Sequence, residues 1–190
     1  MFKRLSVNAN KVPLKVLSLK AARAGFTLVE FLVVIGIIAI LTLILFVNYQ
    51  PFKEELALQR ATAKLAQDIR RAEGMAISSQ EFSSCGSGYK HQYGIFFKQS
   101  KPKEYSLFAD CNNNGDYDQG VDKIVGEVID IESGASITNL SSSFLRIVFS
   151  PPDPIVIINP SADLAIITLS NSEGQSKIIG VNKAGLIYVK

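Results

Sequence analysis

Residues 26–47 form a largely apolar stretch that contains one acidic side chain, Glu30. A carboxylate in hydrocarbon costs about 2.5 to 3.5 kcal/mol, so an acid within a membrane segment usually has a partner and a function. The small pair Ala24-Gly25 precedes this stretch, whereas an ordinary secretory signal carries its cleavage site after the apolar core. Cleavage after Gly25 would keep the stretch and expose a new amino group on Phe26. That amine lies one helical turn before Glu30, and the two groups have the chemistry of an ion pair.

Two opposite charges attract strongly in a low-dielectric environment, but only a paired geometry recovers the cost of removing them from water. We therefore expect Glu30 to favour one register between neighbouring helices. Two alternatives stay open. The stretch could be a plain signal anchor that tolerates an acid, or a signal peptide that is removed.

The charge distribution predicts the orientation of this segment in a membrane. Residues 26–47 comprise 22 residues, roughly 33 Å as a helix, which is enough to span a bilayer. The 25 residues before them carry six basic side chains and no acid, so the amino end should stay in the cytoplasm and the carboxyl end should lie outside. Without this leader the net charge changes from +3 to −3, so the basic precursor charge is no nucleic-acid signature.

The segment from Gly25 to Val34, which reads GFTLVEFLVV, resembles the amino-terminal motif of type IV pilins and of the pseudopilins of type II secretion. The resemblance implies cleavage after Gly25 by a prepilin peptidase and N-methylation of Phe26. It also implies that a membrane assembly platform polymerises the mature helices with other pilin subunits, in a homo- or hetero-filament. In this family the residue at the position of Glu30 neutralises the amino terminus of a neighbouring subunit.

The rest of the chain predicts an α+β fold, a long amino-terminal helix packed on an antiparallel β-sheet in the manner of pilins. We expect a cleaved leader over 1–25, a transmembrane or filament-core helix over 26–47, an amphipathic continuation over 48–80 with a kink at Pro51, and a β-rich exported domain over 81–190. A helical stripe should face the sheet, and Lys64 and Asp68 could pair on the opposite side. The stripe consists of Leu58, Leu65, Ile69, Ala72 and Ala76.

Short apolar or alternating runs broken by turn residues predict strands in the second half of the chain. Residues 171–174 and 182–185 have the composition of hairpin turns, and the prolines at 151, 152 and 154 indicate an edge or a loop. The expected strands cover residues 93–98, 105–110, 123–130, 145–150, 155–159, 164–170, 177–181 and 186–189.

The two cysteines, Cys85 and Cys111, both lie in the part of the chain expected outside the cytoplasm. An oxidising compartment favours a disulfide between them. Two unpaired thiols are the alternative, because the sequence does not give the distance between the two residues.

The segment from Asp110 to Asp122 places oxygen ligands at alternate positions around a glycine, as calcium loops of the EF-hand type do. Position 12 of such a loop, normally an acid, is Val121, and the acid follows one residue later. A metal-free turn explains the same composition, so both interpretations stay open. The candidate ligands are Asp110, Asn112, Asn114, Asp116, Asp118 and Asp122.

The sequence contains no phosphate-binding glycine loop, His/Cys metal cluster or pair of catalytic acids, which argues against an enzyme. No cofactor is required, and calcium is the one candidate. We expect a structural subunit, a pilin, minor pilin or pseudopilin, of a type IV pilus or a related secretion filament. Its precursor should be a single-pass cytoplasmic (inner) membrane protein, and its final place a pilus or pseudopilus, periplasmic or on the cell surface.

The alternative function is a tip or priming subunit that binds DNA, a surface or a secreted substrate. Some relatives in competence systems bind DNA through a basic carboxyl-terminal surface, and many carry a glycine-basic pair where this chain has Gly185-Leu186. DNA binding is therefore not favoured. A third class is a membrane-tethered domain that never polymerises, for which the charge of Glu30 would be irrelevant.

Overall fold

The computed structural model describes residues 25–47, 49–86, 90–152, 155–160 and 162–190, so most of the expected leader lies outside the described residues. The chain divides into two compact units, with the boundary between Ile44 and Leu45. The helix α1 (Leu28–Val47) begins in the first unit, and the second unit contains α2 (Tyr49–Ile77) and all the strands.

The helix α1 is apolar along its whole length. A window from Leu28 to Leu45 is long and apolar enough to cross a membrane. Every side chain from Phe26 to Leu45 is exposed, except at the one glycine, which has none. A helix that is apolar on all sides requires a lipid or protein environment, which the described residues do not supply around α1.

The helix α2 carries the predicted stripe, and this prediction is confirmed. Leu58, Leu65, Ile69, Ala72 and Ala76 are all at most 2% exposed. The helix ends at Ile77, because Gly74 and the two serines after it are weak helix formers.

One local prediction for α2 needs correction, and the kink at Pro51 stays a prediction, because the residue between α1 and α2 lies outside the described residues. Pro51 itself lies in the first turn of α2, where a proline removes no helical hydrogen bond. Among the described residues no ion pair joins Lys64 to Asp68. Instead the Tyr105 hydroxyl donates a hydrogen bond of 2.5 Å to the Asp68 carboxylate and links α2 to a strand.

The strands form two antiparallel sheets. The larger has six strands in the order β3-β2-β1-β6-β7, with β4 also paired to β2, and the smaller has the order β10-β9-β8-β5. Their bounds are β1 Gln92–Lys98, β2 Glu104–Asp110, β3 Lys123–Ile124, β4 Ile129–Asp130, β5 Ser136–Leu140, β6 Phe144–Ser150, β7 Ile155–Asn159, β8 Leu164–Ser170, β9 Ser176–Asn182 and β10 Ile187–Val189.

The sequence predicted most of these strands, but it missed β5 and read residues 123–130 as one strand. In the structure that segment forms β3 and β4, separated around Gly126, whose φ of +83° interrupts the extended backbone. The strand β5 was missed because its sequence, SITNL, has little apolar alternation. Its pairing with β8 gives it a place in the smaller sheet.

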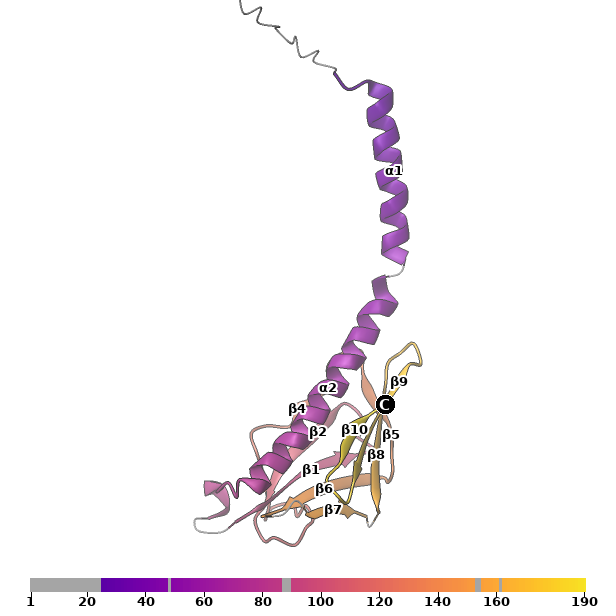
Figure 1. Ribbon diagram of the computed structural model, residues 1–190. Helices are drawn as coiled ribbons and strands as arrows, with labels where there is room; N and C mark the ends of the chain where they lie inside the picture. Colours follow the sequence, from indigo (N-terminus) through magenta and orange to yellow (C-terminus); the bar gives the residue numbers. More distant parts are fainter. Residues whose placement is uncertain (1–24, 48, 87–89, 153–154, 161) are drawn as a thin grey trace, which may run out of the picture. The chain divides into compact units, whose positions relative to one another are not determined.

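One hydrophobic core joins α2 to both sheets, and Figure 1 shows α2 running alongside the strands. The core takes alternate residues from each strand, such as Ile95 and Phe97 of β1, Leu107 of β2 and Ile167 of β8. The remaining residues of β1, β2 and β6 therefore point to the opposite face of the larger sheet. We call this second surface the outer face.

Candidate functional site

The expected cleavage position lies on an exposed, non-helical segment directly before α1. Gly25, Phe26 and Thr27 have no regular secondary structure, and Phe26 is 81% exposed. The Thr27 hydroxyl oxygen accepts a hydrogen bond of 3.2 Å from the Glu30 backbone N–H. Thr-x-x-Glu is the sequence of a capping box, in which a side chain satisfies a free N–H group of the first turn. The start of α1 is thus defined by the motif itself.

Glu30 contributes two separate groups to this region. Its backbone N–H is satisfied by Thr27, whereas its carboxylate forms no hydrogen bond or ion pair with any other described residue. The positive end of the helix dipole favours an acid in the first turn. The carboxylate is therefore free to meet a charge from outside the chain.

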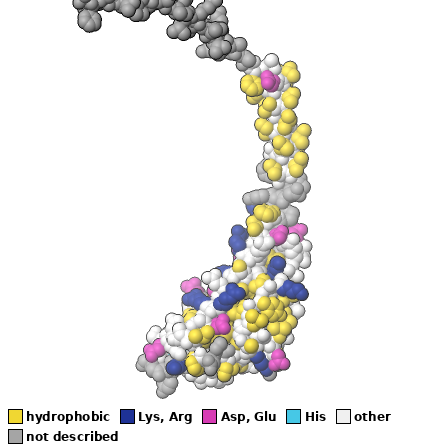
Figure 2. Space-filling view, viewed as in Figure 1, with side chains coloured by type: hydrophobic (Ala, Val, Ile, Leu, Met, Phe, Trp, Pro, Cys, Tyr) yellow, Lys and Arg dark blue, Asp and Glu magenta, His cyan; other side chains and the backbone are white. Residues whose placement is uncertain are grey.

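The surface that follows Glu30 is apolar on the face that Figure 2 shows, where hydrophobic side chains cover α1. Phe31, Ile40 and Leu43 are 60% to 68% exposed. The Thr42 hydroxyl donates to the Ile38 carbonyl, so this polar group is satisfied within the helix. The surface of α1 that a partner could contact is therefore hydrophobic, with one unpaired carboxylate near its amino end.

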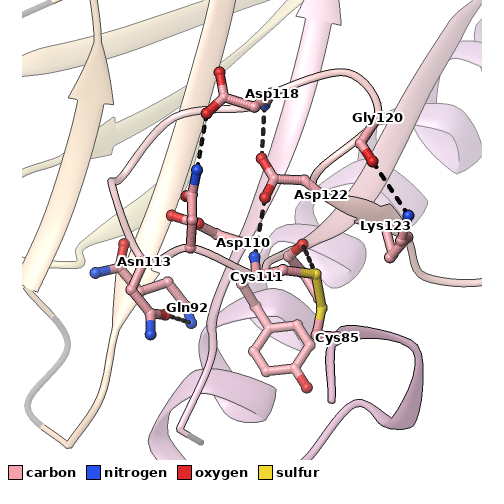
Figure 3. The surroundings of a disulfide bond; sticks show 12 residues. Cys85, Gln92, Asp110, Cys111, Asn113, Asp118, Gly120, Asp122 and Lys123 are labelled. Carbon is pink, nitrogen blue, oxygen red and sulfur yellow. Dashed lines mark hydrogen bonds between the residues drawn. A yellow bond between two sulfur atoms is a disulfide. The ribbon is translucent and has the colours of Figure 1, made fainter.

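The predicted disulfide between Cys85 and Cys111 is present, with Cα atoms 5.1 Å apart (Figure 3). Cys85 ends a short 3₁₀ turn, Ser83–Cys85, a few residues after α2, and Cys111 directly follows β2. The bond therefore fastens the segment after α2 to the edge of the loop predicted as a calcium site.

In that loop the two buried acids accept hydrogen bonds from the loop's own backbone. The Asp110 carboxylate accepts from the N–H groups of Gly115 at 2.7 Å and Asn114 at 3.3 Å. The Asp122 carboxylate accepts from Cys111 at 2.9 Å and Asp118 at 2.6 Å (Figure 3). Burial raises the pKa of Asp110, and the nearby charge of Asp122 raises it further, while the N–H donors oppose the shift.

The exposed part of the loop is also occupied by internal contacts. The Asp118 carboxylate accepts from the side-chain amides of Asn112 at 3.0 Å and Asn114 at 2.6 Å. The Asp116 carboxylate forms an ion pair of 2.5 Å with Arg146 on β6. Each of the six candidate side chains therefore already has another contact.

A calcium ion would need six to eight oxygen ligands. In the described part of the chain, no group of three or more His, Cys, Asp or Glu side chains is placed to hold a metal ion. The hydrogen bonds above are sufficient to explain the form of the loop. Both interpretations of the loop therefore stay open: a metal-free turn, and a calcium site formed by Asp110, Asn112, Asn114, Asp116, Asp118 and Asp122.

The loop has a second role that the sequence did not reveal, because it covers part of the outer face. The Tyr117 ring stacks on Phe96 at 4.9 Å between ring centres and meets Phe108 edge-on at 5.0 Å. Gly94 leaves room for this packing, since a Cβ atom there would lie 2.9 Å from the Phe108 ring. Tyr117 thus covers the part of the outer face formed by Phe96 and Phe108.

Beside this covered part lies a group of aromatic and basic side chains. The Arg146 guanidinium lies 4.5 Å from the Phe144 ring centre and 5.6 Å from that of Phe96, and the Lys98 ammonium lies 5.2 Å from Phe96. These distances are typical of cation–π contacts. The alternation Phe144-Leu145-Arg146 could have placed Phe144 and Arg146 on one face, but only the strand pairing brings Lys98 opposite Phe144.

Comparison with known proteins identifies the amino-terminal region. The family model for the prokaryotic N-terminal methylation motif matches residues 20–46. Two curated proteins named fimbrial protein, both from Pseudomonas aeruginosa, are each 32% identical over 79 residues, which is 42% of this chain and 51% of the relative. The chain thus spans about half the length of these relatives. No solved structure matches it.

Proposed function

We propose that this chain, whose methylation motif and fimbrial relatives support its place in the type IV pilin family, is a subunit of a type IV pilus or of a type II secretion-like filament. The family is structural, and the chain is not an enzyme. In our proposal a prepilin peptidase cleaves after Gly25, Phe26 is N-methylated, and an assembly platform in the membrane adds the subunit to other pilin subunits.

The observation that carries the proposal is the unpaired Glu30 carboxylate at the capped start of an exposed apolar helix. In a filament, α1 would exchange lipid for neighbouring helices, and Glu30 would meet the new amine of a neighbouring Phe26. An isolated buried carboxylate is costly, so subunits in the wrong register would be disfavoured.

The proposed organisation follows from this mechanism. Residues 1–25 are the leader, 26–47 the membrane and filament-core helix, 48–80 the amphipathic helix, and 81–190 the exported β-rich domain. Before assembly the chain is anchored by α1 with its carboxyl end outside the cytoplasmic membrane. After assembly it belongs to a pilus or pseudopilus.

Processing is tested by expressing the full chain with and without its prepilin peptidase and measuring the amino terminus and intact mass of the membrane extract. We expect a mature chain that begins with N-methylated Phe26. An uncut chain despite an active peptidase would contradict the proposal and favour a plain signal anchor.

Assembly is tested with Glu30→Gln, which removes the charge and keeps the length and shape of the side chain. We expect mature subunits to accumulate in the membrane and filaments to fall by more than about tenfold, because a charge pair is lost in a low-dielectric site. Thr27→Ala is the matched control, since it weakens the helix cap and leaves the charge in place. Normal assembly of Glu30→Gln would instead favour a tethered domain that does not polymerise.

A tip or priming subunit is the second candidate, favoured by the open aromatic and basic part of the outer face. A shaft subunit occurs in many copies per filament and a tip subunit in few. Quantitative mass spectrometry of purified filaments distinguishes these two positions.

A further inference from the structure

The part of the outer face that Tyr117 leaves open forms a trough of two adjoining hollows. The larger has a volume of about 490 Å³, within the range of roughly 300 to 1,000 Å³ that is usual for ligand sites. The smaller, of about 150 Å³, shares Phe96 and Lys98 with it and reaches Tyr117 and Gln119. We call both together the outer trough. The larger hollow is lined by Phe96, Lys98, Gln99, Ser100, Ser143, Phe144 and Arg146.

The outer trough remains accessible when α2 is packed. The helix α2 covers the opposite face of the larger sheet, where Ile95, Phe97 and Leu107 belong to its core. Phe144, whose side chain belongs to the outer face, is 41% exposed. This surface is therefore open within the second unit, and exposed aromatic side chains grouped in a hollow are typical of binding sites.

The charges of the outer trough favour a ligand with few negative groups. Arg146 is already paired with Asp116, and Lys101 with Glu104. Lys98 has no carboxylate within ion-pair distance in the described part of the chain. No acid lines the larger hollow. The trough thus offers one uncompensated positive charge next to an exposed ring.

We propose that the outer trough binds a polysaccharide that contains uronic acid residues. A sugar ring has a face of C–H groups, whose partial positive charge suits an aromatic ring, and Phe144 remains 41% exposed beside the Arg146 guanidinium at 4.5 Å. Its hydroxyl groups can bond to Ser100 and Ser143 at the rim, and its carboxylate can pair with Lys98. One ligand unit then uses the apolar, polar and charged parts of the larger hollow.

A single-stranded nucleic acid fits the same surface less well. It carries one phosphate per nucleotide, and proteins bind it with grooves that contain several uncompensated cations as well as stacking rings. Here Lys98 alone is uncompensated, and one side of Phe96 is already stacked on Tyr117.

The test measures binding of the full chain, in detergent micelles, to immobilised polygalacturonate. This readout needs no filament assembly, so its result is independent of the proposed subunit role. We expect saturable binding that Lys98→Gln and Phe144→Ala each weaken by about fivefold or more. Lys177→Gln is the matched control, because Lys177 lines a separate groove beside α2, and we expect less than about a twofold change there.

Four results would overturn the proposal. Equal binding of the carboxyl-reduced polymer would show that the uronic carboxylate is not recognised. An equal loss in Lys177→Gln would indicate unspecific charge attraction. Tighter binding of a 20-nucleotide oligo-dT, weakened by the same two substitutions, would identify a nucleic-acid surface instead. The absence of binding by a wild-type chain with its disulfide intact would also reject it.

Discussion

The two helices of this chain have opposite relations to the rest of the protein. In α2 a stripe from Leu58 to Ala76 is buried against both sheets, and Tyr105 adds a hydrogen bond to Asp68. In α1 every side chain up to Leu45 is exposed, and the Glu30 carboxylate has no partner among the described residues. The partners of α2 lie within the chain, whereas α1 has none among the described residues.

The largest difference between the two helices is expected when the same change is made in each. Leu65→Ala in α2 should lower the free energy of unfolding by about 2 to 5 kcal/mol, because Leu65 is fully buried. Leu41→Ala in α1, at a residue 55% exposed, should leave it unchanged. Denaturant unfolding in detergent, followed by circular dichroism, measures both. Equal losses would show that α1 also packs within the chain.

A slightly smaller effect is expected for the disulfide that fastens the segment after α2. Removing it with Cys85→Ala and Cys111→Ala together should cost about 3 kcal/mol, because the bond closes a loop with a sequence separation of 26. The unfolding midpoint with and without reductant gives the measurement. A reductant should destabilise the wild type and not the double variant, and an identical response of both would contradict the prediction.

The hydrogen bond between α2 and β2 should contribute less. Burial and the hydrogen bond to Asp68 both raise the pKa of Tyr105, so its hydroxyl keeps its proton and donates. Tyr105→Phe should therefore cost about 1 to 2 kcal/mol at neutral pH, measured by denaturant unfolding. Tyr188→Phe, at a more exposed tyrosine, is the control and should have little effect. If both variants lost the same stability, the bond to Asp68 would not be responsible.

The loop from Asp110 to Asp122 should show a weak dependence on pH. Because the pKa of Asp110 is raised in the folded chain, the folded state binds its proton more tightly than the unfolded state does. Its contribution to stability is therefore greatest below the ordinary pKa of 3.8 and declines as pH rises through the raised pKa. Unfolding between pH 3 and 7 should show this decline in the wild type and not in Asp110→Asn. An equal slope in both would assign it to other groups.

The smallest expected effect is that of calcium. The loop oxygens already accept hydrogen bonds from N–H groups or pair with Arg146. Millimolar Ca²⁺ should therefore leave the midpoint of thermal unfolding unchanged. A differential scan with Ca²⁺ and with a chelator measures this. A saturable rise with Ca²⁺ and not with Mg²⁺ would show that the loop rearranges into an ion site.

The features that the sequence predicted are those encoded by nearby residues. The stripe on α2 follows the helical period, and the turn at 171–174 follows from Asn171, whose side chain accepts the Gln175 N–H at 2.9 Å. The disulfide was predicted from the expected oxidising compartment and from the presence of two cysteines. Each of these signals needs only a short segment or a count.

The features that it missed depend on distant pairings. The strand β5 acquires its place from β8, and Lys98 meets Phe144 only through the register of β1 with β6. The alternating oxygen-bearing side chains from Asp110 to Asp118 are compatible with a metal site and with a metal-free turn. The same residue types are common in both, so the sequence did not distinguish them. Which N–H groups would satisfy them depends on the folded backbone.

Because α1 is apolar on all sides, hydrophobic burial does not determine its rotation about its own axis. When a helix is apolar on every side, its hydrophobic burial is nearly the same at every angle of rotation about its own axis. Burial therefore determines how deep the helix lies but not which side faces a given neighbour. Thr27 fixes where the helix begins, and the Glu30 side chain leaves it in a single direction. The direction of the Glu30 side chain can therefore set the rotation of α1 about its own axis among neighbouring helices.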